Sequence, residues 1–201
     1  FLKDYFLPGH AALRKELYLA ALQRVEGDAR EGGGAQDYAL QGRLRRLLGD
    51  RSAAESDFER SLALDPSCAP AYAFRGEMRL VRQPELALSD LSEAIRRRPR
   101  ESCYHLWQGY AYFLLGNMGE ALAALGRAIG LDAGLAAARI LRGIIRDRSG
   151  DDAGAEDDYS WVAARAPRCA GIHTLRATVR CRRGDLEGAV ALDTLDLRGR
   201  F

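Results

Sequence analysis

Several features that would point to a common function are missing from this 201-residue sequence. No stretch approaches the roughly 18 consecutive apolar residues that a membrane-spanning helix needs. The 30 basic and 28 acidic residues leave a net charge of only +2, which creates no strong field toward nucleic acid. We therefore expect neither a membrane span nor a nucleic-acid partner.

A disulfide framework is missing as well. The four cysteines are far apart and include no C-x-x-C pair. The closest two, Cys169 and Cys181, would be about 18 Å apart along one helix, whereas a disulfide needs Cα atoms within about 7 Å. We expect buried free thiols in a reducing compartment. The expected location is therefore the cytoplasm; the absence of a signal peptide adds little to this, because the sequence opens at Phe1 without a methionine.

Residues that commonly carry catalysis are few. Two of the three histidines, His105 and His173, recur at the same place in an internal repeat, which favours a packing role over metal ligation. Gly32–Gly34 lacks the preceding strand and the Gly-Lys-Ser/Thr ending of a phosphate loop. The acidic run from Asp151 to Asp158 falls at the start of a predicted helix, where carboxylates suit the helix dipole. We predict no catalytic residues, no metal, no cofactor and no enzymatic activity.

The sequence does contain a short motif that ends in glycine and recurs along the chain. Its four copies are Tyr38–Gly42, Tyr72–Gly76, His105–Gly109 and Arg139–Gly143. The glycines are 34, 33 and 34 residues apart, and Ala177 takes the glycine's place in a fifth copy. A fixed period of this length is typical of stacked repeats.

Each copy of the motif is followed by a turn and then by a second segment with apolar residues at helical spacing. The turn signals are Gly49-Asp50, Gln83-Pro84, Gly116-Asn117, Gly150-Asp151 and Gly184-Asp185. Prolines that would stop a helix close three of the second segments, at Pro66, Pro99 and Pro167. The pattern predicts five helix pairs in which the shared glycine is buried where the two helices touch. The first helices are expected near residues 36–48, 70–82, 103–115, 137–149 and 171–183.

These residues resemble the tetratricopeptide repeat, a helix–turn–helix unit of 34 residues. The resemblance implies an all-α fold, a right-handed superhelical solenoid, and a role in protein–protein interaction. It covers residues 35–201, with units expected at 35–68, 69–101, 102–135, 136–169 and an incomplete 170–201. The family's usual leucine before the glycine is replaced here by Gln41, Arg75, Gln108, Arg142 and Arg176.

Two of these replacements indicate an ion pair inside a unit. Arg75 and Arg142 occur in units that also carry Asp90 and Asp158 just before an apolar residue of the second helix. We predict an Arg–Asp bond between the two helices of these units, the alternative being two solvated charges. The third unit has alanine in the aspartate's place and should lack this bond.

The ends of the chain depart from the repeat. Residues 1–34 should form an apolar segment, a helix from about Ala11 to Val25 and a glycine-rich joint before the array. Leu13, Leu17, Ala21 and Val25 recur every fourth residue and predict one apolar stripe on that helix. A last helix from about Glu187 to Leu197 is too apolar for a free cap, so further chain or a second copy is expected to cover it.

In the tetratricopeptide family the first helices line a concave groove that binds peptides. The groove should be polar and basic in the first unit and apolar in the third, where Leu106, Tyr110 and Phe113 share one helix face. The lysine and asparagine with which some relatives grip a carboxylate terminus are missing at the matching positions. The predicted partner-binding residues are Arg43, Arg46, Glu77, Leu106, Tyr110, Phe113, Ile140, Ile144, Asp147 and Thr178.

We therefore expect a non-catalytic adaptor whose groove binds a polypeptide segment with apolar or aromatic anchors. Two alternatives stay open: a structural module that self-associates through its terminal helices, and the non-catalytic arm of a larger protein. The apolar floor could also be hidden by neighbouring units, or covered by the chain's own segment Phe1–Leu7.

Overall fold

The computed structural model of the chain describes residues 11–30, 32–167 and 169–190. These ranges form α-helices and contain no β-strand. One helix, α2 (Ala11–Arg30), precedes the array. The first helices of the five units are α3 (Ala35–Leu48), α5 (Ala69–Arg79), α7 (Ser102–Leu114), α9 (Ala136–Arg148) and α11 (Ala170–Arg182). The second helices are α4 (Arg51–Leu64), α6 (Pro84–Arg97), α8 (Met118–Leu131) and α10 (Asp152–Arg165), and the chain is helical again at 186–190.

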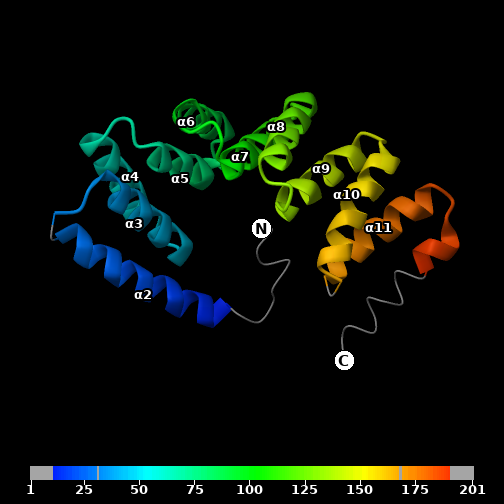
Figure 1. Ribbon diagram of the computed structural model, residues 1–201, viewed down its shortest axis with the longest axis horizontal. Coiled ribbons are helices and arrows are strands. Elements are labelled where there is room, and N and C mark those ends of the chain that lie inside the picture. The colour runs from blue at the N-terminus through cyan, green and yellow to red at the C-terminus, as the bar shows by residue number, and fades with distance from the viewer. Residues whose placement is uncertain (1–10, 31, 168, 191–201) are drawn as a thin grey trace.

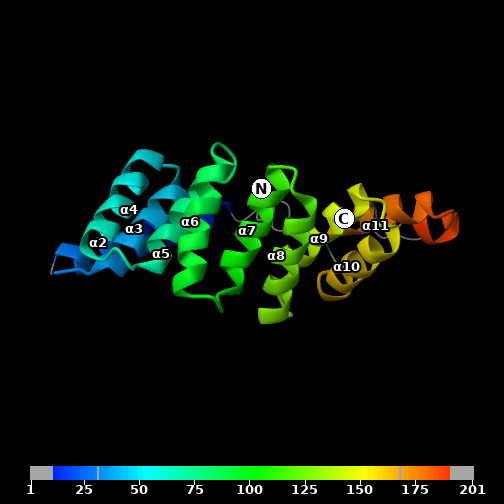
Figure 2. The same cartoon turned by 90° about the horizontal axis from the view of Figure 1, so that it is seen from above.

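The helix pairs follow one another along an arch from α2 to α11 (Figure 1). The second helices α6 and α8 lie on its outer side and the first helices α5 and α7 on its inner side. Seen from above, the helices stand side by side in a single row (Figure 2). Each first helix starts one residue before its predicted position, so the five predicted first helices and the helical solenoid are confirmed.

A glycine turn ends most of the first helices in the same way. After α3, Gly49 adopts a left-handed conformation with φ of 95°, and Asp50 N–H donates to the Arg45 carbonyl at 2.9 Å. Left-handed glycines follow α7, α9 and α11 as well, because a residue without Cβ takes this conformation at little cost. The second unit has no turn glycine: Leu80 to Gln83 connect α5 to Pro84 at the start of α6, and the unit is one residue shorter.

The repeated glycines lie where the two helices of a unit touch, as predicted. All four, Gly42, Gly76, Gly109 and Gly143, are buried. A Cβ added to Gly109 would come within 2.8 Å of Leu125 Cγ, and one added to Gly42 within 2.7 Å of Phe58 Cε1. The missing side chain therefore lets each first helix approach its second helix closely.

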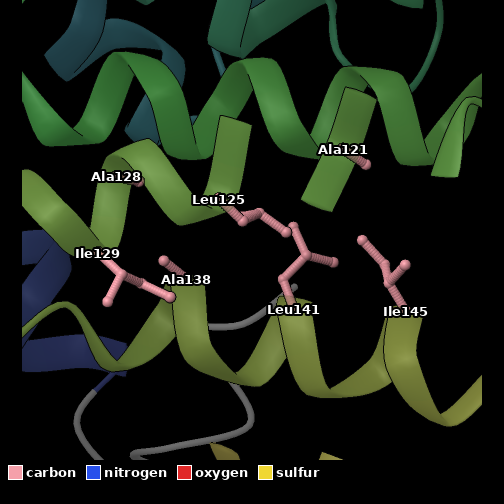
Figure 3. Packing of buried hydrophobic residues seen from close by; sticks show 7 residues of the cluster. All are labelled: Ala121, Leu125, Ala128, Ile129, Ala138, Leu141 and Ile145. Carbon is pink, nitrogen blue, oxygen red and sulfur yellow. The ribbon is translucent and has the colours of Figure 1, made fainter. Parts of the chain in front are cut away.

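The core is continuous from unit to unit. Ala121, Leu125 and Ile129 of α8 face Leu141 and Ile145 of α9, across the boundary between the third and fourth units (Figure 3). A single helix pair could not bury both of its apolar faces, so stacking completes the core.

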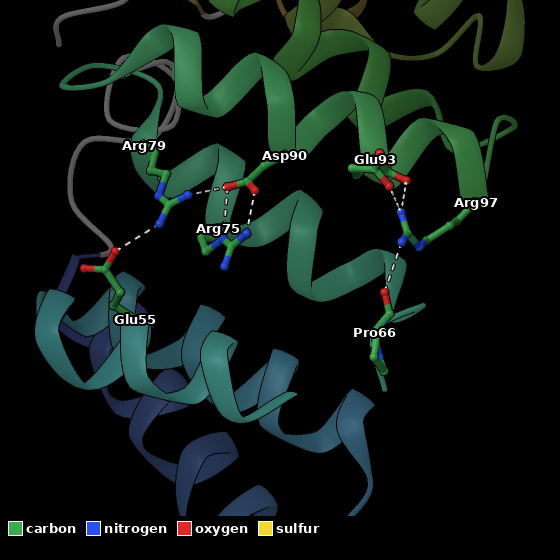
Figure 4. A network of polar contacts seen from close by, with 7 residues as sticks. All are labelled: Glu55, Pro66, Arg75, Arg79, Asp90, Glu93 and Arg97. Atoms are coloured by element: carbon green, nitrogen blue, oxygen red, sulfur yellow. Dashed lines mark hydrogen bonds and ion pairs between the residues drawn. The ribbon is translucent and has the colours of Figure 1, made fainter. Parts of the chain in front are cut away.

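Ion pairs between arginines and carboxylates also link the helices. Arg75 donates to both carboxylate oxygens of Asp90 at 3.0 and 2.7 Å, which confirms the predicted pair (Figure 4). Arg79, one turn further on, donates to Asp90 at 2.9 Å and also to Glu55 of the preceding unit at 3.2 Å. Asp90 thus links the two helices of its own unit, and Arg79 links that unit to the preceding one.

The fourth unit repeats this arrangement. Arg142 donates to Asp158 at 2.8 and 2.6 Å, and Arg146 donates to it at 2.9 Å. In the third unit the corresponding positions hold Gln108, Tyr112 and Ala124, so no such pair can form there, as predicted.

Helix α2 packs against α3 as a cap on the array. It is five residues longer than expected, and Glu26 near its end accepts a hydrogen bond from Arg45 at 2.9 Å. The predicted apolar stripe is wrong at Leu17, whose exposure is 59%, although Val25 is buried. The segment Phe1–Leu7 lies outside the described residues.

The cysteines are free, as predicted, but they are not all buried. Cys68 is buried, Cys103 and Cys169 are half-buried, and Cys181 is exposed. In the part of the chain that the structure describes, no helix has the length and apolar character to cross a membrane. The cytoplasmic location stays a prediction.

Candidate partner-binding face

Helix α7 is the one first helix without a charged Asp, Glu, Lys or Arg. Its residues Leu106, Tyr110 and Phe113 are half-buried and pack over the apolar cluster around Leu125. The Tyr110 and Phe113 rings are stacked, with centroids 6.3 Å apart. These three predicted site residues therefore form one apolar, partly aromatic surface at the middle of the array.

An adjacent side of α7 is fixed by aromatic packing. Trp107 meets Phe74 of α5 edge-on at 6.2 Å and stacks on Tyr104 at 6.1 Å. Burial raises the pKa of Tyr104 to about 12, so its phenol stays neutral and the contact stays apolar. This packing sets the rotation of α7 and hence which of its side chains remain partly exposed.

Charged residues stand on both sides of this surface. Arg46 of α3 forms an ion pair with Glu77 of α5 at 2.7 Å, so these two predicted site residues lie together. On the other side, Asp147 of α9 pairs with Arg182 of α11, which also reaches Asp152 at 2.7 Å. Each pair joins neighbouring units, so these charges also have a structural role that the sequence did not predict.

Two further arginines stack on aromatic rings. The guanidinium carbon of Arg43 lies 4.6 Å from the centroid of the Phe74 ring. That of Arg148 lies 5.0 Å from the centroid of the Phe113 ring. Arg43 is one of the predicted partner-binding residues, and Arg148, which follows Asp147 directly on α9, also belongs to the predicted groove lining.

One predicted site residue needs correction. Ile140 is only 3% exposed and belongs to the cluster of Tyr159 and Ile172, because α10 and α11 pack over it. It offers no surface to a partner. Ile144, one turn later, is half-buried against the same cluster, and Thr178 is exposed with its hydroxyl donating to the Thr174 carbonyl at 3.0 Å.

We use the name first-helix face for the remaining predicted site residues together with Arg148. Its members are Arg43, Arg46, Glu77, Leu106, Tyr110, Phe113, Ile144, Asp147, Arg148 and Thr178. A cavity of about 340 Å³ lies apart from them, near the start of α5, and is lined by Gln36, Asp65, Ser67, Cys68, Ala69, Pro70, Arg97 and Arg98.

The two histidines at the repeat position have packing roles. His105 and His173 are both buried, and each donates from Nε2 to the carbonyl of the proline that ends the preceding unit. The distances are 2.8 Å to Pro99 and 2.9 Å to Pro167, which confirms the structural interpretation of this repeat position. Among residues 11–30, 32–167 and 169–190, no group of three or more His, Cys, Asp or Glu is placed to hold a metal ion.

Stacked helix pairs with a 34-residue period and an uninterrupted interunit core define an α-helical repeat solenoid. Two family profiles, both described as tetratricopeptide repeat, match residues 38–68 and 81–136. The chain carries tetratricopeptide repeats in these two ranges, and the function that they support in general terms is that of a protein–protein interaction module.

Solved structures share the fold. The chain is similar to MamA, with 21% identity over 79% of this chain and 93% of that one and a TM-score of 0.72. It is similar to YrrB, with 20% identity over 90% and 92% and a TM-score of 0.68. The type IV pilus biogenesis factor PilW superposes with a TM-score of 0.79 at 16% identity over 90% and 86%. No curated protein matches the sequence significantly.

Proposed function

We propose that this chain is a non-catalytic adaptor whose first-helix face binds a polypeptide segment through apolar or aromatic anchors. The observation that carries the proposal is the uncharged helix α7 at the middle of the array. Its partly exposed residues Leu106, Tyr110 and Phe113 stand between charged first helices on both sides. Aromatic residues at the centre of a contact, surrounded by polar residues, are the usual source of binding energy in protein interfaces.

The similarity to YrrB is in keeping with this proposal. YrrB is a tetratricopeptide repeat protein with an unusual peptide-binding site. Repeat solenoids present extended surfaces along their first helices, and a peptide laid across them contacts several units at once. The expected occupant therefore crosses units rather than filling one cavity.

The test is selection of binders from a displayed library of random peptides, followed by affinity measurements on the selected sequences. Tyr110→Glu places a charge in the apolar centre and should weaken binding at least about tenfold, because the carboxylate must be desolvated on contact. Phe113→Ala, which only removes ring area, should weaken it less. The matched control is Leu86→Glu on α6, whose side chain is 48% exposed on a second helix.

Circular dichroism of each variant would show whether the array is still folded. Binding that survives Tyr110→Glu and Phe113→Ala in folded protein would place the partner site elsewhere and overturn the proposal.

Self-association through the last helix is a second candidate. Leu186 and Val190 are 64% and 63% exposed, whereas most of the predicted helix from Glu187 to Leu197 lies outside the described residues. Molar mass measured by light scattering should then rise with protein concentration, and Leu186→Glu should abolish the rise. A constant monomer mass would exclude this role.

A further inference from the structure

The arginines of the first helices are almost all neutralised within the chain. Among the described residues, every arginine of α3, α5, α9 and α11 forms an ion pair with an Asp or Glu except two, Arg43 and Arg148. Both belong to the first-helix face, and α7 between them has no arginine.

Their surroundings hold these two arginines in place without using up their hydrogen-bonding capacity. Phe74 and Phe113 each cover one flat face of a guanidinium group. A ring contacts that face and leaves the N–H donors at its edge available for a planar anion. The Arg43 Nε is buried without a hydrogen-bond partner, as is Oε2 of Glu77 on the adjacent helix, so polar atoms at this end of the face are unsatisfied.

The free charge on the face therefore has one sign. Its two carboxylates, Glu77 and Asp147, are already paired with Arg46 and Arg182. The unpaired cations are Arg43 on α3 and Arg148 on α9, one on each side of the uncharged α7. A complementary partner carries negative charge on both sides of an apolar centre.

Helix spacing sets the length of such a partner. Helices α3, α5, α7 and α9 contact one another in this order. At about 8–10 Å between adjacent packed helices, three steps span on the order of 25–30 Å. An extended chain advances about 3.3 Å per residue, so eight or nine residues, roughly, would cover this span.

We propose that the partner of the first-helix face is an extended acidic peptide segment of another protein. Carboxylates near its two ends pair with Arg43 and Arg148, and apolar or aromatic side chains between them contact Leu106, Tyr110 and Phe113. This inference rests on the proposed function and names the chemical class of its partner.

The test uses two synthetic peptide pools about ten residues long, which matches the estimated span. The acidic pool has Asp or Glu at both ends and Leu, Phe, Tyr or Trp in the middle. The amide pool is identical except for Asn or Gln at the ends. Binding to the full chain is measured by fluorescence anisotropy at low and high salt. We expect the amide pool to bind about five- to tenfold more weakly, because charge-assisted bidentate bonds are lost.

Variants then assign the charge contacts. Arg43→Gln and Arg148→Gln should each weaken binding of the acidic pool several-fold and make that binding less dependent on salt. Binding of the amide pool should not change. The control is Arg96→Gln on α6, an arginine that is 67% exposed and pairs with Glu93. Arg96→Gln should change the binding affinity of neither pool.

The outcomes separate this inference from the proposed function. If both pools bind equally and both lose binding in Tyr110→Glu, the peptide face stands and the acidic partner is wrong. If neither pool binds, both proposals fail. If a single-stranded oligonucleotide of equal charge displaces the acidic pool as well as unlabelled peptide does, the face recognises anions in general and the inference is overturned.

Discussion

At the scale of single residues, size decides where the helices can meet. Gly109 lies against Leu125, a fully buried side chain that has no room to move aside. Gly126 sits in the middle of α8, yet a Cβ added there would meet nothing within 4 Å. The two glycines therefore have different reasons to be present, and only the first is required by packing.

We predict that Gly109→Ala lowers the free energy of unfolding by about 1–3 kcal/mol, because the added methyl group overpacks the contact. Gly126→Ala should raise it by up to about 1 kcal/mol through better helix propensity. Urea unfolding of the two variants measures both values. Equal effects at the two positions would contradict the packing argument.

Asp57 shows what a missing neighbour does to a buried carboxylate. It accepts from Arg45 alone, because Gln41 stands where the second and fourth units have an arginine. Burial raises the pKa of Asp57 from 3.8 to about 6, against the opposing attraction of Arg45. The folded chain therefore keeps this proton to a higher pH than the unfolded chain does.

Between pH 3.8 and about 6 the folded state binds more protons, so the contribution of Asp57 to stability falls as the pH rises through this window. We predict that the free energy of unfolding of Asp57→Asn, relative to that of the unchanged chain, rises by up to about 3 kcal/mol between pH 4 and pH 7. Urea unfolding at several pH values measures this difference. A difference that does not vary with pH would refute the prediction.

At the scale of helices, the paired arginines decide how strongly one element holds another. Asp90 is 6% exposed and accepts from two arginines, one of which also reaches the preceding unit. Glu93, on the same helix, is 40% exposed and pairs with Arg96 on the surface and with Arg97, which also donates to the Pro66 carbonyl (Figure 4). Removing Asp90 leaves Arg75 without its acceptor and leaves Arg79 with Glu55 alone. Removing Glu93 leaves Arg96 in solvent and Arg97 still bound to the Pro66 carbonyl.

We predict that Asp90→Ala lowers the free energy of unfolding by about 2–4 kcal/mol and that Glu93→Ala lowers it by about 0.5 kcal/mol or less. Adding Arg75→Gln and Arg79→Tyr to Asp90→Ala copies the third unit, in which Gln108, Tyr112 and Ala124 occupy these positions. This triple variant should recover much of the loss. If it is less stable than Asp90→Ala alone, the arginines stabilise the unit without their aspartate and the argument is wrong.

At the scale of the whole molecule, the array is stabilised mainly by contacts between adjacent units. Among the described helices, the extensive contacts of each unit are with the units before and after it, so stability is a sum of local and nearest-neighbour contributions. A change at one boundary should therefore act locally. The boundary between α8 and α9, where Leu141 is 4% exposed, lies far along the row from α3 and α4 (Figure 2).

We predict that Leu141→Ala lowers local stability by about 2–5 kcal/mol through the cavity it creates. Amide hydrogen exchange should accelerate in α8, α9 and α10 and stay unchanged in α3 and α4. An equal loss of protection at both ends of the chain would show that the array unfolds as one cooperative unit instead.

The sequence by itself determined the repeat, the helices and the contacts inside a unit. The period, the turn glycines and the buried glycines depend on residues close together in the chain, as do the pairs Arg75–Asp90 and Arg142–Asp158. Their geometry follows from helix pitch and a short turn, so their positions in the sequence were enough to predict them.

Only the tertiary structure decided which side chains on the first helices stay available. Ile140 is buried by α11, Arg46 is paired with Glu77, and Asp147 is paired with Arg182. Each of these contacts joins residues of neighbouring units, about one period apart in the chain. They depend on how far one unit is rotated against the next, and that rotation results from side-chain packing along the whole boundary. The repeat period does not encode it, so the sequence predicted a line of candidate residues and the packing selected among them.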